Sequence, residues 1–484
     1  MPDHRDALQV MFAEPNRFPN FGDALMRIHI QGFRCHSNTL IEVQSPITAF
    51  CGLNGTGKST ILQLSAAAYA KCTTRPWAYY IKDFLVVGTL DPKPFRDDAA
   101  VEYRYWQADR SLRPLRLSRN ASTRRWQGYA RRPPRHVLFV GVGHYLPKVE
   151  QRDFLTRNAH RLTVSKQSAV GAHIRDWTCK VLGQHYSSVQ SNTVKCFNRT
   201  GTVISVERAG VSYSESHMGY GEGRTQYLIS ALEMLPEGSL ILIEEPETSL
   251  HPSAQFEFGR YLVDVARRRR HQAFMTTHSE FLLEALPSQS RVYLSKTDSG
   301  IQTLLGLTAL QAKSLMAQGH VKAVHLLVED TCAKAVLTEL LRRVDPEFLR
   351  SVGICEAGSA ETIAATIRSL RLTGLPVAAV RDGDKGDAPR DNVFKLPGTQ
   401  APERELFASV AVKGYVAQTY GINLDDLTAT LVGVDHHEWF ARLSELANQD
   451  EGALIGEVAR VYARNLPELE VSTLVTLLKE GSRR

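Results

Sequence analysis

Early in the chain, hydrophobic and polar positions alternate at a period of two and then give way to a continuously apolar run. This change falls within residues 24–60, and the apolar run ends in the glycine-rich segment GLNGTGKS. The pattern predicts two or three strands that lead into a buried strand, a loop and a helix. Further on, GSLILIEEPETSLHP predicts a buried strand that ends in acids, and HQAFMTTHSEFLLEAL predicts a strand that runs into a helix.

A second alternation of strands and helices begins after a linker helix that we predict over residues 307–322. The segments AVHLLVED, VGICEAG and LPVAAVRDGD predict strands with helices between them, and this order implies a small parallel sheet. The remainder of the chain predicts helices. We therefore expect an α/β protein in three parts: a first domain over residues 20–316, a smaller α/β domain over residues 320–402 and a mainly helical extension over residues 403–484.

Composition adds the class of protein. The chain has 484 residues, 43% hydrophobic and 23% charged, which fits a folded protein of two to three domains. It has no apolar run of about 18 residues and no N-terminal signal pattern, so we expect a cytoplasmic protein without a membrane span. The seven cysteines are scattered without a C-x-x-C pair. Their spacing argues against a disulfide framework or a zinc site and fits a reducing compartment.

The positive charge is concentrated in one segment. The net charge is +7 and the isoelectric point about 9.0, which favours a polyanionic partner. Residues 110–135 carry nine arginines and no acid, with Trp126 and Tyr129 interleaved. Arginine presents a fixed fork of donors to phosphate and can stack on bases, so we expect this segment to contact DNA. A solvated basic hairpin is the alternative.

The segment GLNGTGKS matches G-x-x-x-x-G-K-[ST] in full and lies between a predicted buried strand and a helix. Backbone N–H groups of such a loop cradle phosphates at the helix N-terminus, the lysine reaches the β/γ-phosphates, and the hydroxyl of Ser59 would bind Mg²⁺. We therefore expect ATP and Mg²⁺ at Gly52, Asn54, Gly55, Gly57, Lys58, Ser59 and Thr60.

The strand LILIEEPE would complete the nucleotide site, because an apolar strand must deliver a carboxylate close to the metal. We assign Glu244 to the metal and Glu245 to the attacking water as the catalytic base. His278, in the segment TTHS, would contact the γ-phosphate. The alternatives are a solvated strand end for the two acids and a surface position for the histidine.

These segments resemble the ATPase heads of the ABC class, in the branch of the SMC-like and RecF-like DNA-repair ATPases. The resemblance implies an ATP-bound homodimer and a signature loop before the acidic strand, for which HMGYGEGRTQYLISALE is the candidate. Residues that would meet the nucleotide of a second subunit are Gly219, Gly221, Glu222 and Arg224. The chain departs from the pattern in three ways: the usual serine is absent unless Ser216 replaces it, Glu244 stands where aspartate is more common, and no glutamine loop can be placed. Too few residues separate the two halves of the head for SMC-type coiled coils.

Carboxylates follow two strands of the smaller predicted sheet. Glu329 ends the first of these strands, and Asp382 and Asp384 end the last. An isolated D-G-D is usually a turn, but open α/β sheets carry their sites at the carboxyl ends of strands. Three converging carboxylates cannot all stay ionised without a counter-charge, so we expect a hard cation such as Mg²⁺.

A strand-end glutamate followed by D-x-D resembles a TOPRIM domain. An ABC head followed by a TOPRIM domain resembles the OLD (overcoming lysogenisation defect) nucleases, a family that includes the ATPase–nuclease subunit of Gabija-type phage defence. The resemblance implies Mg²⁺ or Mn²⁺ at Glu329, Asp382 and Asp384, with Glu329 and Asp382 catalytic in phosphodiester cleavage. Glu403 or Glu405 would add a further carboxylate.

Two further features of the smaller domain bear on a metal site, namely a missing acid and a pair of adjacent histidines. The second acid that OLD nucleases commonly carry is absent, because position 333 is alanine, and Asp330 is expected to point elsewhere. In VDHHEWF, His436 and His437 suggest a metal ligand pair. Adjacent residues of a helix do not face each other, so we interpret this segment as a helix start.

The sequence thus predicts a homodimeric or larger ATPase that processes DNA through a metal-dependent endonuclease domain, in anti-phage defence or DNA repair. The alternative is a TOPRIM-like domain that has lost activity. The chain would then sense or clamp DNA and license a separate nuclease or toxin partner, as in Septu- and PARIS-type defence. A transport-type ABC ATPase is a third class, which the C-terminal α/β domain and the missing glutamine loop disfavour.

Overall fold

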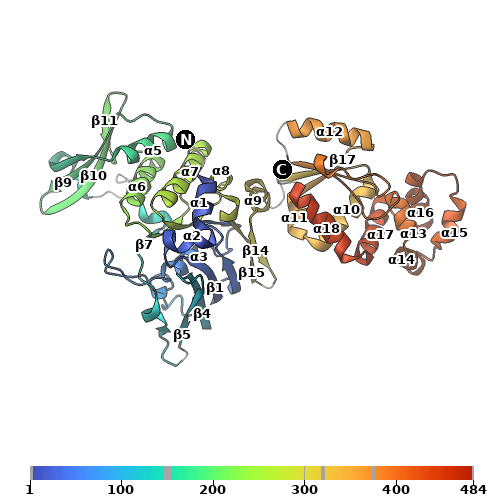
Figure 1. The fold of residues 1–484 in the computed structure, drawn as a ribbon, viewed down its shortest axis with the longest axis horizontal. Helices are drawn as coiled ribbons and strands as arrows, with labels where there is room; N and C mark the ends of the chain where they lie inside the picture. The colour runs from blue at the N-terminus through green and yellow to red at the C-terminus, as the bar shows by residue number, and fades with distance from the viewer. Residues whose placement is uncertain are drawn as a thin grey trace. The chain divides into compact units, whose positions relative to one another are not determined.

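The computed structural model describes residues 4–120, 122–146, 150, 154–298, 300–317, 322–372 and 376–481. The chain divides into two compact units, residues 1–312 and residues 313–484 (Figure 1). This division falls within the predicted linker helix, which forms as α9 over Ala309–Met316. Residues 318–321 of that predicted helix lie outside the described residues.

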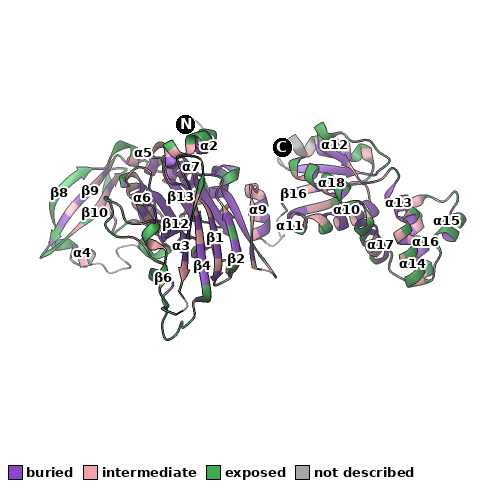
Figure 2. Cartoon of the chain, turned by 60° about the horizontal axis from the view of Figure 1, so that its bottom comes forward, coloured by how far each residue is buried: buried purple, intermediate pink, exposed green. Residues whose placement is uncertain are grey.

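A six-stranded sheet forms the centre of the first unit. Its strand order is β15, β14, β3, β13, β12 and β7, and every neighbouring pair is parallel except β14 with β15. The strands span Gly300–Leu305 (β15), Arg291–Thr297 (β14), Ile47–Gly52 (β3), Gln272–Thr276 (β13), Leu240–Glu244 (β12) and Val137–Val140 (β7). The continuously apolar segments become the central strands, and β3 and β13 are buried at every position (Figure 2).

Helices flank this sheet. Those of the first unit, besides α9, are α1 (Arg5–Phe12), α2 (Glu14–Phe21), α3 (Lys58–Ala66), α4 (Phe154–Arg157), α5 (Ala172–Leu182), α6 (Tyr220–Met234), α7 (Pro252–Arg268) and α8 (Glu280–Ala285). The helix α3 packs against β3, β12 and β13, so the phosphate loop before it lies at the carboxyl ends of these strands. Both α1 and α2 begin before residue 20, where we predicted the domain to start, and α1 packs against α7.

Two antiparallel sheets complete the first unit. One has the order β2 (His36–Glu42), β1 (Leu25–Phe33), β4 (Phe95–Trp106), β5 (Leu112–Arg119) and β6 (Trp126–Gln127). The other has the order β11 (Val211–Ser214), β10 (Arg199–Arg208), β9 (Ser188–Cys196) and β8 (Thr163–Ala169). Alternating burial along β1 and β2 matches the period-two pattern of their sequence.

The second unit contains a four-stranded parallel sheet, as the strand and helix alternation predicts. Its order is β17 (Val352–Glu356), β16 (Val324–Val328), β18 (Val377–Arg381) and β19 (Val393–Lys395). The chain leaves β16 toward β17 on one side and later returns to β18 on the other. In open α/β sheets, ligands bind at the carboxyl ends of the strands where the order reverses, and these strands are β16 and β18 here.

Helices make up the rest of the second unit. They are α10 (Thr331–Val344), α11 (Pro346–Ser351), α12 (Ala360–Leu372), α13 (Pro402–Ala408), α14 (Val410–Tyr420), α15 (Leu424–Thr430), α16 (Trp439–Ala447), α17 (Glu451–Asn465) and α18 (Glu468–Gly481). A short 3₁₀ helix, η7 (His436–Glu438), precedes α16. Across both units, none of the described helices is long and apolar enough to cross a membrane.

Candidate functional site

The phosphate loop joins β3 to α3 through residues in left-handed backbone conformations. Gly57 is the N-cap of α3 with φ +81°, and Gly52 has φ +143°. A Cβ on Gly57 would lie 2.1 Å from the His36 Nε2, and one on Gly52 would lie 2.6 Å from the Leu294 carbonyl oxygen. Both positions therefore require glycine for conformation and for space.

His36 contacts the phosphate loop, and the sequence analysis did not predict this residue as part of the site. It is fully buried, its Nε2 lies 3.1 Å from the Gly57 carbonyl oxygen, and its Nδ1 lies 3.1 Å from the Thr39 Oγ1. Burial lowers the pKa of this imidazole, which favours the neutral ring. The only signal in the sequence was its place on the buried side of the period-two pattern.

Lys58 lies over the loop, where a phosphate would be held. Its Nζ donates to the carbonyl oxygens of Gly52 at 2.9 Å and Leu53 at 3.0 Å. Burial lowers the pKa of this ammonium, and the Glu245 and Glu247 charges oppose that shift. The predicted loop residues Asn54, Gly55 and Ser59 are exposed, whereas Thr60 is buried and its Oγ1 accepts from Arg34 at 3.4 Å.

The acidic strand and the switch-like strand deliver the other predicted groups to this loop. β12 and β13 are parallel, with Glu244 opposite Thr276. Glu245 has φ +43°, and its N–H donates to the backbone and side-chain oxygens of Thr276 at 3.1 and 3.2 Å. The His278 Nε2 lies 3.9 Å from the Glu245 carboxylate. Burial and then the Lys58 charge lower the pKa of His278, and the Glu245 charge opposes that shift.

Glu247 is a buried carboxylate that the sequence analysis quoted in EEPETSLHP but did not assign. It accepts from the Thr277 hydroxyl at 2.6 Å and from the His278 N–H at 2.8 Å. Burial raises its pKa. The side chain therefore ties the loop after β12 to the loop after β13 and fixes the backbone that carries His278.

The signature-like segment lies at the start of α6. Gly219 is the N-cap and is exposed, and a Cβ on Gly221 would lie 2.4 Å from the Ser249 carbonyl oxygen. The Glu222 Oε1 accepts from the hydroxyls of Tyr186 and Tyr213, each at 2.7 Å. These contacts anchor the segment within its own chain.

Arg224 does not lie where we expected. Its side chain is buried with 2% of its surface exposed, and Nη2 donates to the Glu244 carbonyl oxygen at 2.8 Å. It therefore supports the acidic strand of its own chain. The expectation that it meets the nucleotide of a second subunit is wrong, because α6 faces the guanidinium inward.

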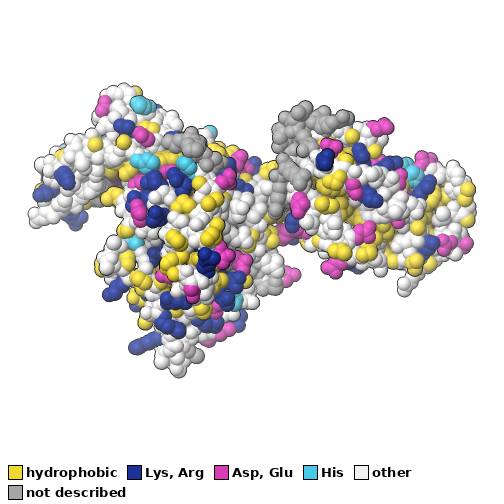
Figure 3. Space-filling model, in the orientation of Figure 1, with side chains coloured by type: hydrophobic (Ala, Val, Ile, Leu, Met, Phe, Trp, Pro, Cys, Tyr) yellow, Lys and Arg dark blue, Asp and Glu magenta, His cyan; other side chains and the backbone are white. Residues whose placement is uncertain are grey.

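The arginine-rich segment divides into buried and exposed members. Arg132 donates to the Ala67 and Tyr79 carbonyl oxygens at 3.0 and 2.8 Å, and Arg135 donates to the Gly238 carbonyl oxygen at 2.7 Å. Both side chains are buried and satisfy backbone carbonyl groups. The exposed arginines are Arg110, Arg116, Arg124, Arg125 and Arg131. Cationic side chains gather on this part of the surface (Figure 3).

The interleaved aromatic residues of this segment are also structural. The Trp126 ring stacks on the Phe33 ring with centroids 5.6 Å apart. The Tyr129 hydroxyl accepts from the Ile81 N–H at 3.1 Å. Both side chains are therefore held by contacts within the first unit, so the expected DNA contact rests on the exposed arginines.

The three predicted acids of the second unit follow the carboxyl ends of β16 and β18. The Asp382 N–H donates to the Glu329 Oε1 at 3.3 Å, which brings the two strand ends together. Asp382 is buried with 4% of its surface exposed, and its Oδ1 has no hydrogen-bond partner among the described residues. Asp384 is exposed and forms an ion pair of 3.0 Å with Lys385.

The carboxylates around Asp382 act on one another. The pKa of Asp382 is raised to about 8, chiefly by burial. The negative charges of the neighbouring acids raise it further; these are Glu329, Asp330, Glu403 and Asp384. Burial likewise raises the pKa of Glu403, with Asp330 contributing. A divalent cation would stabilise the ionised form of such a cluster, so this donor set fits a hard metal ion.

Glu403 and Glu405, both on α13, occupy different environments. Glu403 is buried within the acidic cluster. The Glu405 Oε1 accepts from the backbone N–H groups of Thr399 and Gln400 at 2.7 and 2.9 Å, so it holds the loop before α13. Gly383 allows that loop to approach, because a Cβ there would lie 2.9 Å from the Gln400 carbonyl oxygen.

Asp330 does not point away from the site, contrary to our expectation. As the N-cap of α10 it accepts the Ala333 N–H on Oδ1 at 2.8 Å. Its Oδ2 lies 3.5 Å from the His437 Nδ1, and its charge acts on both Asp382 and Glu403. Ala333 itself is fully buried on α10.

The segment with two adjacent histidines does start a helix, as predicted, but the argument that the rings face apart is wrong. His436 and His437 form η7, and their ring centroids are 4.1 Å apart. The geometry of an α-helix does not apply to this first 3₁₀ turn. The His437 Nδ1 also lies 3.5 Å from the Glu403 Oε1.

Comparisons with known proteins identify an ATPase domain in the first unit. Residues 101–284 match the family model described as "AAA domain, putative AbiEii toxin, Type IV TA system", and residues 27–73 match a second model described as "AAA domain". No curated protein matches the chain. Over these residues the first unit is therefore similar to ATPase domains of the AAA type.

Among solved structures, the chain is similar to the SMC head domain from Thermotoga maritima at 14% identity, with a TM-score of 0.36, 58% of this chain covered and 98% of the other. The Smc head bound to the C-winged helix domain of ScpA matches at 15% identity and a TM-score of 0.39, with 58% and 98% covered. The Smc head with an extended coiled coil, bound to the C-terminal domain of ScpA from Pyrococcus furiosus, matches at 12% identity and a TM-score of 0.38, with 60% and 98% covered.

Proposed function

We propose that the first unit is an ABC-type head that hydrolyses ATP between two copies of the chain. The main support is that Glu245 lies 3.9 Å from His278 and that the charges of Lys58 and Glu245 act on each other and on His278. Lys58 would move from its two carbonyl acceptors to the β/γ-phosphates, which are stronger acceptors. Mg²⁺ would be held by Ser59 and Glu244, and it would neutralise charge on the transferred phosphoryl group.

Glu245 serves as the base that orients and deprotonates the attacking water. Its carboxylate is partly exposed, and its backbone is fixed by two hydrogen bonds to Thr276, so the side chain is held at the loop while remaining accessible. His278 supplies an imidazole N–H to the γ-phosphate, and its neutral ring, favoured by burial, suits that role. Glu247 keeps both strand-end loops in register.

We further propose that the second unit is a TOPRIM-type, metal-dependent DNA endonuclease. Support comes from Asp382, a buried carboxylate beside Glu329 with one oxygen that lacks a partner among the described residues. Such a group is costly unless it is protonated or bound to a cation. Glu329, Asp382 and Asp384 would hold Mg²⁺ or Mn²⁺, which would polarise the scissile phosphodiester.

DNA would reach this centre under the control of ATP in the cytoplasm, in anti-phage defence or DNA repair. The exposed arginines of residues 110–131 offer a phosphate-binding surface on the ATPase unit. A homodimer formed through the heads would present two such surfaces. This arrangement would let the nucleotide state decide whether DNA is held.

One observation favours a second function. Ala333 is fully buried at the position where OLD nucleases commonly carry an acid, so that ligand of a two-metal centre is missing. In that case the second unit binds metal without cutting. The chain would then sense DNA and license a separate nuclease or toxin, as in Septu- and PARIS-type defence.

Plasmid nicking tests the proposal. Purified full-length protein is incubated with supercoiled DNA and Mg²⁺ or Mn²⁺, with and without ATP. We expect nicking by the wild type and its loss in Asp382→Asn. The matched control is Asp387→Asn, because Asp387 is an exposed acid of the same loop and should not alter cutting.

The outcomes separate the two functions. Cutting that survives Asp382→Asn would come from a contaminant or another site and would contradict the nuclease proposal. No cutting by wild type, combined with DNA-stimulated ATP hydrolysis that depends on Lys58, would support the licensing ATPase.

A further inference from the structure

The second unit holds a group of possible metal ligands that shares only Glu403 with the acidic cluster around Asp382. The side chains of Glu403, His436 and His437 each offer one ligand atom, and these atoms all lie within 4.8 Å of one another. They come from α13 and η7, whereas the acids of the nuclease proposal follow β16 and β18. We call the three residues the histidine cluster.

We propose that the histidine cluster binds a divalent transition metal ion of the Zn²⁺ class, separate from the hard cation at the strand ends. The first support is ligand chemistry. Imidazole suits Zn²⁺, Cu²⁺, Fe²⁺ and Ni²⁺, whereas Mg²⁺ and Ca²⁺ prefer oxygen ligands alone. Two imidazoles with one carboxylate form a three-ligand set that leaves a position for water.

The separation between His437 and Glu403 is close to that of two ligands on a common ion. Its Nδ1 lies 3.5 Å from the Glu403 Oε1 and 3.5 Å from the Asp330 Oδ2. These separations exceed the usual 2.7–3.2 Å of an N–H···O hydrogen bond. Two ligand atoms at about 2.0–2.1 Å from a tetrahedral ion lie about 3.4 Å apart, which matches the distances found.

The burial of Glu403 is a second, independent observation. The residue has 3% of its surface exposed, and its Oε2 has no hydrogen-bond partner among the described residues. A buried carboxylate that lacks full pairing is costly, and a bound cation would remove that cost. The same cation would offset the effect of the nearby Asp330 charge on Glu403.

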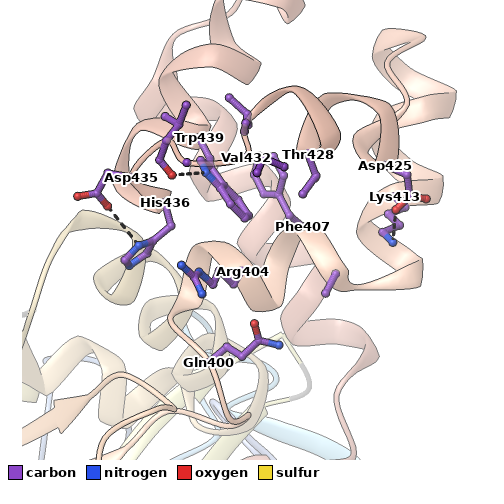
Figure 4. A pocket seen from close by; sticks show the side chains of 14 residues that line it. Gln400, Arg404, Phe407, Lys413, Asp425, Thr428, Val432, Asp435, His436 and Trp439 are labelled. Carbon is purple, nitrogen blue, oxygen red and sulfur yellow. Dashed lines mark hydrogen bonds and ion pairs between the residues drawn. The ribbon is translucent and has the colours of Figure 1, made fainter.

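His436 is held in the orientation that a metal ligand needs. Its Nδ1 lies 3.2 Å from the Asp435 Oδ1, and the pair is joined in Figure 4. Metal-binding histidines commonly give their second ring nitrogen to a carboxylate, which fixes the ring and leaves the other nitrogen for the ion. Asp435 is therefore a positioning residue that leaves the His436 Nε2 for the metal.

An ion could enter from a pocket on this side of the unit. His436 lines a pocket of about 890 Å³ together with Arg404 and Trp439 (Figure 4). His437 has a side chain 53% exposed, so its ring can move the short distance that full coordination requires. The histidine cluster is thus accessible at the imidazoles and anchored at the buried glutamate.

Co²⁺ is the probe for this proposal, because its visible absorption reports the ligand set when it replaces Zn²⁺. Full-length protein is stripped with EDTA and titrated with Co²⁺, followed by competition with Zn²⁺. We expect one Co²⁺ per chain with visible bands of low coordination number, displaced by Zn²⁺. His436→Gln and His437→Gln should each weaken binding at least about ten-fold.

Two control variants separate this site from others. His185→Gln removes an exposed histidine of the first unit and should bind Co²⁺ like the wild type. Asp382→Asn should keep the visible bands while losing DNA nicking, so failure of the nuclease proposal and failure of this one give different results. Circular dichroism of the metal-free variants checks that each is folded.

The proposal fails if the wild type gives no visible bands. It also fails if His437→Gln binds Co²⁺ as tightly as the wild type, or if the bands vanish in Asp382→Asn and persist in His437→Gln. The last result would assign the ion to the strand ends. If His436→Gln were unfolded, Co²⁺ binding by His437→Gln would still test the proposal, because the side chain of His437 is exposed.

Discussion

At the residue scale, each unit contains a residue in an energetically unfavourable state, either a rare backbone conformation or a buried charge-bearing group. Glu245 has φ +43°, a value that is rare outside glycine, and two hydrogen bonds to Thr276 hold it there. Asp382 is buried beside other acids. Strained or costly residues of this kind tend to gather where a ligand binds.

Asp382 makes stability depend on pH. Its pKa rises from 3.8 in the unfolded chain to about 8 in the folded one, so between these values the folded chain holds a proton that the unfolded chain has lost. Stability therefore falls as pH rises through that window, by at most about 1.4 kcal/mol per pH unit. In EDTA, the melting temperature of the wild type should fall from pH 5 to pH 8 by at least about 3 °C more than that of Asp382→Asn.

Mg²⁺ provides the control for this titration. At pH 8 it should raise the melting temperature of the wild type and have less effect on Asp382→Asn, because the cation binds the ionised carboxylate. Equal pH profiles for the two proteins in EDTA would show that Asp382 is not held protonated by the fold.

Glu245 should control ATP turnover without controlling ATP binding. Replacing the carboxylate by an amide removes the base but leaves the phosphate loop intact, so Glu245→Gln should bind ATP and hydrolyse it at least about 100-fold more slowly. Steady-state phosphate release and nucleotide binding by fluorescence measure the two effects. Glu237→Gln, an exposed glutamate of the same unit, should hydrolyse ATP like the wild type.

At the scale of elements, continuous apolar runs located the site-bearing strands. The segments that end at Gly52, Glu244 and Arg381 form β3, β12 and β18, because strands buried on both faces leave a plain signal. Because neighbouring strands in these sheets are parallel, their carboxyl ends lie at the same edge of the sheet. Those two facts were enough to predict that Glu329 and Asp382 meet, but not that Asp330 joins them.

Side-chain direction inside short elements could not be predicted in the same way. The position of Asp330 depends on its role as an N-cap, which accepts with one oxygen and turns the other toward His437. The two histidines approach because η7 is a 3₁₀ turn. His36 holds the phosphate loop from a strand distant in sequence, and no local pattern marks such a contact.

Charge counting could not separate the structural arginines of this segment from the solvent-facing ones, for a physical reason. A guanidinium that satisfies buried carbonyl groups looks the same in sequence as one that meets solvent. Arg132 and Arg135 belong to the first kind, whereas Arg124 and Arg125, in the turn between β5 and β6, belong to the second. Only the exposed kind can bind a phosphate without unfolding the protein.

This division predicts separable effects on DNA binding and stability. The double variant Arg124→Ala/Arg125→Ala should lower DNA affinity and reduce the salt dependence of binding by one to two phosphate contacts, with an unchanged melting temperature. Arg135→Ala should instead lower the melting temperature, because it leaves buried carbonyl groups unpaired. Fluorescence anisotropy at several salt concentrations measures the first effect, and unchanged binding by the double variant would remove this turn from the DNA surface.

At the scale of the whole molecule, the proposed homodimer completes the ATP site of the first unit. In an ABC-type dimer the signature segment of one copy would meet the ATP of the other. Gly219 is exposed at the N-cap of α6, and a Cβ there would meet no atom within 4 Å. A side chain at this position therefore tests the dimer without disturbing the monomer.

Gly219→Asp should abolish ATP-dependent dimerisation, because the added carboxylate would face the triphosphate of the partner copy and repel it. Aspartate is a favourable helix N-cap, so the fold should not suffer. In a Glu245→Gln background, light scattering with ATP should show the mass rise from 54.0 kDa to twice that value, and the added Gly219→Asp should prevent the rise. Gly171→Asp is the matched control, since Gly171 is also an exposed N-cap with open space, on α5. A dimer that forms equally well with Gly219→Asp would mean that the start of α6 does not meet the nucleotide. The role of Glu222 would then be limited to the hydrogen bonds that it accepts from Tyr186 and Tyr213.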